Sequence, residues 1–507
     1  MGFLLGIAFS IFLTCVPMDA QLAPDSSIQP ITGELTVSSN PHYFKDANGV
    51  ALILNGSQTW NTFQDWGTGG SVEALDFDAF VRFLTAHGHN FTLLWTVEMP
   101  KFCNMPNTAP SSEFVVTPLP WERSGPGTAT DGGPKFDLTK FNQSFFDRLR
   151  ARTQGLNNAG IYAGIYLFTG EFLNVFRCSS DGYPLTGANN INGIDDGYVS
   201  GKKGTNAVTM TAPNAITRVQ DAYVENVIDT LNDLPNVLWI VSEEAPANSI
   251  WWNHHQIAHI RDYESRKPHH HPIGFAAPIR ARDSVVYNSD ADWVAPSVLV
   301  SPASTCGAGY PACKVDVNDS DHSYFGIWNE TPQQNRNYAW ENFMTGNQVL
   351  FMDPYVLYYP REGRNLCVSP IHSICRAPDT RWENFRDNLG YILRYSHKMD
   401  LSKTSPQDTL SSTGFCLAQT PHAGAKFLLY APVGGSFRMN LSAMPSGRTL
   451  DVEWFNPSTG TVTPGNRVTS GSSSQVFTPP FSGDAVLYLE ETAAQRGHWP
   501  QPNGLSF

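Results

Sequence analysis

Acidic side chains follow two short predicted strands, one of them wholly apolar from Val237 to Val241, and they are the residues best suited to carry chemistry. The segment 236–242 runs into Glu243 and Glu244, and the segment 315–318 runs into Asp319-Ser-Asp-His322. Two carboxyl groups that flank a glycosidic bond can cleave it: one protonates the leaving oxygen, and the other attacks the sugar or activates water. Adjacent acids beside an apolar strand repel each other and are poorly solvated, which raises a carboxyl pKa and retains one proton at neutral pH. The pattern predicts a two-carboxylate centre with its proton donor in the 243–244 pair.

The spacing of the second cluster leaves open which aspartate would act. In an extended segment, positions 315, 317, 319 and 321 share one face, so Asp319 and Asp321 are both candidates. His322 could hydrogen-bond either carboxylate or a sugar hydroxyl. Structural roles compete with these assignments, because acids also favour the first turn of a helix and aspartates often bond backbone amides in turns.

Other kinds of catalytic centre find less support. His255 and His259 have the spacing of a zinc-binding helix, but Gln256 stands where a metalloprotease needs its glutamate base. No Gly-x-Ser-x-Gly elbow of a serine hydrolase occurs. We therefore predict neither a metal nor another cofactor.

The elements that must position the acids alternate between apolar strands and longer amphipathic helices, which predicts a parallel sheet covered by helices. We expect strands at 51–54, 91–97, 161–168, 237–241, 272–276, 293–300, 315–318 and 349–352. We expect helices at 73–87, 139–158, 214–232, 251–266, 333–345 and 381–399. Eight such units predict an α/β fold, a (β/α)8 TIM barrel. An open doubly wound sheet is the alternative, but no Gly-rich phosphate fingerprint follows the first strand.

Reactive side chains of such a barrel lie just past the carboxyl ends of its strands, and the two longest loops, 99–138 and 170–211, also follow strands. Polar and aromatic residues at these ends are therefore candidates for contact with substrate. The candidates for substrate binding are Gln58, Trp60, Trp95, Glu98, Glu171, Glu243, His322, Asp353 and Tyr355.

The composition of the whole chain favours a secreted protein with a neutral ligand. A net charge of −13 argues against binding to the phosphates of nucleic acid. The apolar run 3–16 is too short to span a bilayer and ends near Ala20, which predicts a signal peptide at 1–20 and no membrane segment. Short loops could close disulfides between Cys306 and Cys313 and between Cys367 and Cys375. Asn-x-Ser/Thr sites permit glycosylation where they are exposed.

A second domain follows the predicted barrel of residues 30–405. Residues 402–413 are rich in Ser, Thr and Pro, and the next segments alternate like strands, with turns at 434–435, 445–447 and 457–460. This pattern predicts a small β-sandwich at 414–490, with a tail at 491–507.

Several motifs resemble those of a known family. Asn40-Pro-His-Tyr-Phe-Lys-Asp-Ala-Asn-Gly49, with Leu54-Asn-Gly-Ser-Gln-Thr-Trp60, resembles the opening of the apiosidase-like and cellulase-like glycoside hydrolases. These are TIM barrels of a clan with an Asn-Glu pair after strand four, often followed by a sandwich similar to Val452-Glu-Trp-Phe-Asn-Pro457. The resemblance implies that Glu244 is the acid/base and that Glu243 stands where the clan has Asn. It also implies that Asp321 or Asp319 takes the place of a strand-seven glutamate nucleophile.

The resemblance implies a secreted glycoside hydrolase that acts on an oligo- or polysaccharide. A shorter carboxylate on strand seven would widen the gap between the two acids. A wider gap would admit a water molecule, as a reaction that inverts the sugar configuration requires. The alternative is a non-catalytic carbohydrate-binding or adhesion protein on a degenerate barrel, which the replacement of Asn by Glu243 favours.

Overall fold

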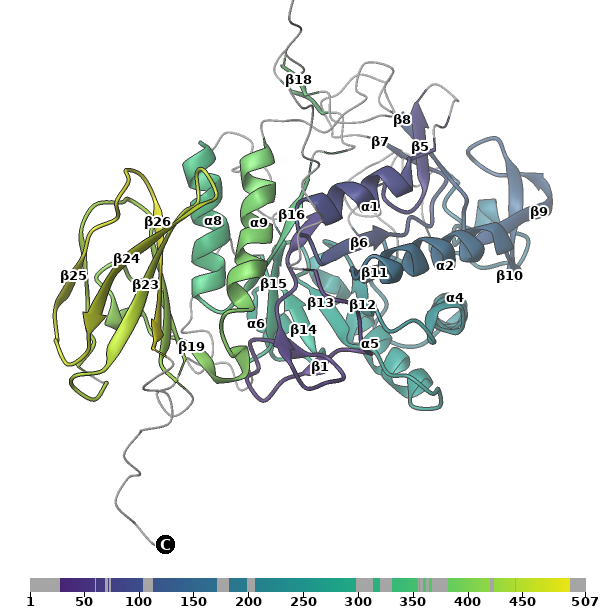
Figure 1. Cartoon of the computed structure of the whole chain (residues 1–507). Coiled ribbons are helices and arrows are strands. Elements are labelled where there is room, and N and C mark those ends of the chain that lie inside the picture. The colour runs from purple at the N-terminus through teal and green to yellow at the C-terminus, as the bar shows by residue number, and fades with distance from the viewer. Residues whose placement is uncertain are drawn as a thin grey trace, which may run out of the picture.

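The computed structural model describes residues 28–492, except for residues 60, 69–71, 73, 104–112, 171–181, 198–205, 298–312, 320–330, 354, 356–358, 362–363, 367–381, 420–423 and 443. These residues form a barrel of parallel strands and, beside it, an all-β domain (Figure 1). No helix among them has the length and apolar character that crossing a bilayer requires.

Eight parallel strands form the wall of the barrel. They are β4 (Gly56–Gln58), β6 (Phe91–Trp95), β11 (Tyr162–Phe168), β12 (Val237–Ser242), β13 (Ile273–Ala276), β14 (Trp293–Ala295), β15 (Val315–Asp319) and β16 (Gln348–Met352). They pair in the order β4-β16-β15-β14-β13-β12-β11-β6. The two ends of this sheet meet where the Asn90 amide donates to the Asn55 carbonyl at 3.0 Å and the Asn55 amide donates to Asn90 Oδ1 at 2.9 Å. The predicted TIM-barrel fold is thereby confirmed.

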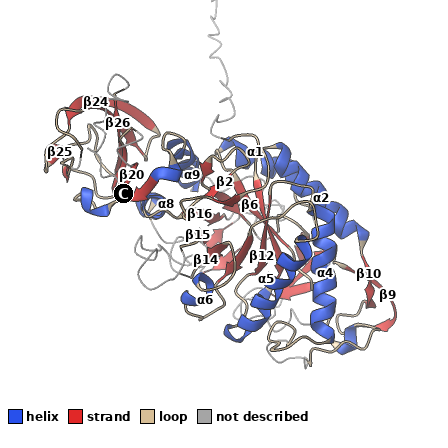
Figure 2. Cartoon of the chain, turned by 90° about the horizontal axis from the view of Figure 1, so that it is seen from below, coloured by secondary structure: helices blue, strands red, loops and turns tan. Residues whose placement is uncertain are grey.

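Helices surround the strands on the outside of the barrel (Figure 2). They are α1 (Phe77–Ala86), α2 (Gln143–Asn158), α4 (Ala215–Leu231), α5 (Ile250–Glu264), α6 (Ser284–Tyr287), α8 (Pro332–Met344) and α9 (Glu383–Ser396). Side chains suited to helix starts cap several of them: Asp76 accepts from the Ala79 amide, and Thr331 forms a capping box with Gln334. Their buried apolar faces pack on strands that are apolar on both sides.

The first barrel strand differs from the prediction. Residues 51–54 were expected to form it, but Ala51–Leu52 is β3, which pairs with β2 (Phe44–Lys45) in a small sheet outside the barrel. The barrel strand is β4, which begins four residues after the end of β3. Gly56 explains why so polar a segment lies there: a Cβ at this position would collide with the carbonyl oxygen of Phe91 on β6. Close backbone contact, rather than side-chain hydrophobicity, places this strand.

Smaller sheets decorate the barrel. β1 (Thr36–Val37) joins β2 and β3; β5 (Asp65–Thr68), β8 (Glu113–Thr117) and β7 (Lys101–Cys103) form a second sheet; β9 (Trp121–Thr128) pairs with β10 (Pro134–Phe141), and β17 (Tyr359–Arg361) with β18 (Arg364–Leu366). The segment 99–138, expected as a loop, therefore contains strands of its own.

The C-terminal domain is built from antiparallel strands. Its six-stranded sheet has the order β19 (Thr404–Pro406), β20 (Cys416–Gln419), β21 (Lys426–Ala431), β26 (Ala485–Glu491), β23 (Thr449–Asn456) and β24 (Thr461–Thr469). A two-stranded sheet of β22 (Phe437–Met439) and β25 (Gln475–Phe477) shares a core with one face of the larger sheet. The other face packs on α8 and α9.

The described cysteines give a partial view of the disulfides. Cys313 is disulfide-bonded, and its partner lies outside the described side chains. The Cys306–Cys313 and Cys367–Cys375 pairs therefore stay predictions, while Cys416 is a buried free thiol.

Candidate functional site

Four neighbouring strand ends are joined by one series of buried contacts. Trp95 Nε1, at the end of β6, donates to Gln58 Oε1 at the end of β4 over 2.9 Å. The rings of Trp95 and Tyr166 lie 4.7 Å apart between centroids, and the Tyr166 hydroxyl donates to the carboxylate of Glu243. All four side chains are buried. The structure thus brings the predicted residues Gln58, Trp95 and Glu243 together, and it adds Tyr166.

Glu244, next to this series, has a strained backbone. Its φ is 38°, a left-handed value that a non-glycine residue adopts only where its surroundings enforce it. Gly170 follows β11, the third strand of the barrel. It lies so close that a Cβ there would be 2.5 Å from the Glu243 carbonyl oxygen and 2.6 Å from Ala245 Cα. On the other side, the Ile279 amide donates to the Ala245 carbonyl at 2.8 Å. Glu244, which is half-buried, is therefore held in a turn that is fixed on both sides.

At the end of β4, several buried polar atoms have no hydrogen-bond partner in the part of the chain that the structure describes. They are Gln58 Nε2, Thr59 Oγ1 and both side-chain polar atoms of Asn61. A buried amide or hydroxyl without a hydrogen bond is costly, so such groups commonly await water or a ligand. Donors and acceptors of this kind are suited to the hydroxyl groups of a sugar. The sequence did not identify Thr59 or Asn61.

Glu98 lies beyond the end of β6 and is buried. Its Oε2 accepts from the Thr169 hydroxyl at 2.6 Å and from the Thr169 amide at 3.1 Å, while Oε1 has no hydrogen-bond partner among the described residues. Burial raises the pKa of Glu98 to about 7, although the hydrogen bonds from Thr169 partly oppose the rise. The side chain is thus an acid with a pKa near neutrality, three residues after Trp95 in sequence.

The strand-seven cluster is described in part. Asp319 is the last residue of β15 and is buried. Asn318, just before it, is held by α8: its Nδ2 donates to Asn342 Oδ1 at 3.0 Å, and its carbonyl accepts from the Tyr338 hydroxyl at 3.4 Å. The predicted residues Trp60, Glu171, Asp321 and His322 lie outside the described residues.

Two predicted residues at the end of strand eight are engaged in packing. Both oxygens of the Asp353 carboxylate accept from Arg386 of α9, at 2.6 and 2.7 Å, and both side chains are fully buried. Tyr355 packs on α1, with its ring 4.6 Å from that of Phe83. Asp353 thus neutralises a buried arginine of helix α9. Contact of Asp353 or Tyr355 with substrate stays a prediction.

The two histidines with metal-like spacing have other partners. His255 Nε2 lies 2.9 Å from Asp221 and His259 Nε2 lies 3.4 Å from Glu225, both on α4. Over the described part of the chain, no three His, Cys, Asp or Glu side chains are grouped so as to hold a metal ion.

Two family models match parts of the chain. Residues 115–295 match a domain of unknown function (DUF6298), and residues 415–490 match the family described as "Putative collagen-binding domain of a collagenase". The second match covers most of the six-stranded sheet. No curated protein matches the chain.

Solved structures of glycoside hydrolases have a similar fold. A glycoside hydrolase family 5 structure from Bacteroides vulgatus is 14% identical, with a TM-score of 0.58 over 91% of this chain and 93% of that one. A second structure, titled "Glycoside hydrolase", is 12% identical, with a TM-score of 0.57 over 93% of this chain and 98% of that one. At these identities the likeness shows a shared fold, which many different activities can use.

Proposed function

We propose that the protein is a glycoside hydrolase that cleaves an O-glycosidic bond in an oligo- or polysaccharide, with Glu244 as the acid/base. The observation that carries the proposal is the strained turn of Glu244, which Gly170 and Ile279 fix at the carboxyl end of β12, the fourth strand of the barrel. Backbone strain of this kind persists where the surrounding structure enforces it, and it gathers at functional sites. Structures with the same fold carry the name glycoside hydrolase.

The chemistry follows from the placement of the acids. Glu244 would donate its proton to the glycosidic oxygen as the bond from that oxygen to the anomeric carbon breaks. Asp319, the last residue of β15, or Asp321, two residues later in sequence, would either attack the anomeric carbon or remove a proton from the attacking water. In the first case, Glu244 then takes a proton from water, and the configuration of the sugar is retained.

The surroundings of the acids would hold the sugar. Gln58, Thr59 and Asn61 offer unpartnered polar atoms to its hydroxyl groups. A neutral glycan suits a chain with a net charge of −13 better than a polyanion does. Glu243, buried against Tyr166, would shape the floor of the site.

The test begins with purified full-length protein and a panel of plant, fungal and bacterial glycans, with product configuration followed by NMR. On any substrate that is cleaved, Glu244→Gln should lower kcat about 10²- to 10⁴-fold, the usual contribution of general acid–base catalysis. On an aryl glycoside of the same sugar with a good leaving group, the first step needs little protonation, so the loss in kcat/KM, which reports that step, should be much smaller. Glu225→Gln on α4 is the matched control and should leave kcat unchanged. Equal loss with both leaving groups would refute the acid role.

The second candidate is a carbohydrate-binding protein without turnover. The observation in its favour is that a buried glutamate, Glu243, stands where the resembling clan has asparagine. Wild type and Glu244→Gln would then be equally inert on the panel and would bind the same glycan with equal affinity.

We further propose that the protein is secreted, because the apolar run 3–16 is followed by a small residue, Ala20, where a signal peptidase could cleave. Expression in a secreting host should yield medium protein whose first residue is Gln21. Protein that stays inside the cell with its N-terminal segment uncleaved would contradict this proposal.

A further inference from the structure

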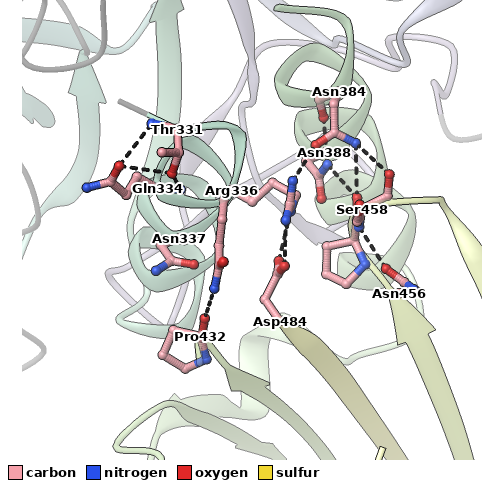
Figure 3. Close-up of polar contacts among 12 residues, drawn as sticks. Thr331, Gln334, Arg336, Asn337, Asn384, Asn388, Pro432, Asn456, Ser458 and Asp484 are labelled. Atoms are coloured by element: carbon pink, nitrogen blue, oxygen red, sulfur yellow. Dashed lines mark hydrogen bonds and ion pairs between the residues drawn. The ribbon is translucent and has the colours of Figure 1, made fainter. Parts of the chain in front are cut away.

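Helix α8 lies between β15, the seventh strand of the barrel, and the C-terminal domain of antiparallel strands, called the β domain below. Tyr338 and Asn342 of this helix hold Asn318, whose Cα is one peptide, about 3.8 Å, from that of Asp319. The helix begins at Pro332 behind the Thr331 cap, and its other face meets the β domain (Figure 3). Any displacement of α8 is therefore passed to the candidate catalytic carboxylate.

A buried ion pair fixes this helix to the β domain. Arg336 Nε donates to Asp484 Oδ2 at 2.8 Å and its NH2 group donates to Oδ1 at 2.6 Å, while its NH1 group donates to Asn384 of α9 at 2.9 Å (Figure 3). The side chains of Arg336 and Asp484 are only 8% and 1% exposed. A bidentate pair that is shielded from water holds its partners in one geometry, and removing either member leaves a buried charge unpaired.

Further contacts near the ion pair also hold α8 against the β domain. The Tyr430 hydroxyl of β21 donates to Asn337 Oδ1 at 2.7 Å, and Gln333 Nε2 donates to the Pro432 carbonyl at 2.6 Å. The ring of Trp340 stacks on that of Tyr430 at 6.0 Å between centroids. The β domain therefore contacts the helix along several turns, through both polar and aromatic side chains.

The α9 helix is held by the same domain. Asn384 Nδ2 donates to the Pro457 and Ser458 carbonyls at 3.2 and 3.1 Å, and Asn388 Nδ2 donates to the Pro457 carbonyl at 3.0 Å (Figure 3). The turn after β23 thus accepts hydrogen bonds from two positions of α9. Domains of one chain move relative to each other unless their interface is well packed and hydrophobic, and here apolar side chains of α8, α9 and the six-stranded sheet share one core.

We infer that the β domain is part of the catalytic unit, with Arg336 and Asp484 as positioning residues that set the strand-seven carboxylate Asp319 through α8. The inference rests on the proposed hydrolase function. Catalytic groups must be held within a fraction of an ångström, and a misplacement of about 1 Å can cost about 10²-fold in rate. A small movement of α8 would therefore reduce turnover before it reduces binding.

The kinetic test compares Arg336→Gln, Asp484→Asn and Arg336→Lys in the full-length protein. The first two should lower kcat about 10-fold or more on the best glycan of the panel while KM changes less than about 2-fold. Arg336→Lys keeps the charge and loses the bidentate geometry, so it should recover part of kcat. The double variant should be no worse than either single one, because both break the same pair. Arg467→Gln, which breaks an exposed ion pair between β24 and Asp451 of β23, is the matched control.

A second measurement needs no substrate. Hydrogen–deuterium exchange should be faster in peptides covering β15 and α8 of Asp484→Asn than in wild type, and unchanged in Arg467→Gln. Tyr430→Phe offers a milder perturbation if Asp484→Asn is poorly folded. Unchanged exchange in β15, or an unchanged kcat beside a lower Tm, would overturn the inference and leave the domain a stabilising role only. A wild type that cleaves nothing would contradict the proposed function instead, while the exchange result still decides the coupling.

Discussion

A histidine between the first and last helices of the barrel should make stability depend on pH above neutrality. His87, at the C-terminal end of α1, lies 2.9 Å from Asp387 and 3.3 Å from Glu383, both on α9. Burial by itself would lower the pKa of His87, but the hydrogen bonds and negative charges of Asp387 and Glu383 outweigh it and raise the pKa to about 9. The protonated ring therefore joins the two helices that flank the closing point of the barrel.

The size and sign of the effect follow from this shift. A rise of the pKa from 6.5 to about 9 corresponds to about 3 kcal/mol, at about 1.4 kcal/mol for each pH unit. Water reaches the two acids, which are 41% and 42% exposed, so this value is an upper bound. Because the pKa is higher in the folded state, the stabilisation is complete below pH 6.5 and is lost as the pH rises through 9.

His87→Gln removes the charge and keeps a hydrogen-bonding side chain of similar size. At pH 6 the variant should melt several degrees below wild type, and by pH 10 the difference in Tm should shrink toward zero. His89 does not interfere, because burial lowers its pKa to about 3 and it stays neutral in this window. Circular dichroism melts at half-unit pH steps from 6 to 10 would measure the difference. A gap of the same size at both ends of the range would refute the reasoning.

Three further predictions concern the site. Gly170→Ala places a methyl group 2.5 Å from the Glu243 carbonyl oxygen and should cut kcat at least about 10-fold, whereas Gly155→Ala on α2, with its nearest neighbour at 3.7 Å, should not; equal kcat for both would contradict the role of the turn. Glu98→Gln should remove a loss of stability that wild type shows as pH rises from 4.5 through about 7, because the pKa of this buried acid is higher in the folded state; melts from pH 4.5 to 8.5 with parallel curves for the two proteins would argue against it. Tyr166→Phe should cost about 1.5–3 kcal/mol in unfolding free energy, since it removes a donor to a buried carboxylate; denaturant titration with an unchanged midpoint would exclude a stabilising bond.

The architecture could be read from the sequence where side-chain hydrophobicity decides it. Strands such as β12 are apolar on both faces and follow amphipathic helices, so their positions were predicted to within a few residues. The first barrel strand could not be found in this way, because Gly56-Ser-Gln58 is polar and a more apolar segment, Ala51–Leu54, lies just before it. Only the close approach of Gly56 to the neighbouring strand distinguishes the two, and that is a property of the packed barrel.

The site was predictable where a polar residue ends an apolar strand, and not elsewhere. Glu98 and Glu243 met that criterion, whereas Gln58 became a candidate because it closely follows the apolar segment Ala51–Leu54. Tyr166 did not, because it lies inside the segment Tyr-Ala-Gly-Ile-Tyr-Leu-Phe and reads as an ordinary core residue. Its register opposite Trp95 is the signal that distinguishes it, and register requires the paired strands. The pair of Arg336 and Asp484 joins residues 148 positions apart, beyond the reach of any local pattern.

The supports of the two candidate carboxyl groups are separate, and this separation has a chemical consequence. Glu244 is held from strands three and five, through Gly170 and Ile279, whereas the strand-seven end is held by α8 and the β domain. Because the two sets share no residue, the losses of Gly170→Ala and Asp484→Asn should add in the double variant. They should also differ in kind. A disturbed proton donor slows substrates with poor leaving groups most, while a displaced strand-seven carboxylate slows good and poor leaving groups alike. Comparing kcat/KM on the glycan and on the aryl glycoside with a good leaving group therefore reports which support has been lost.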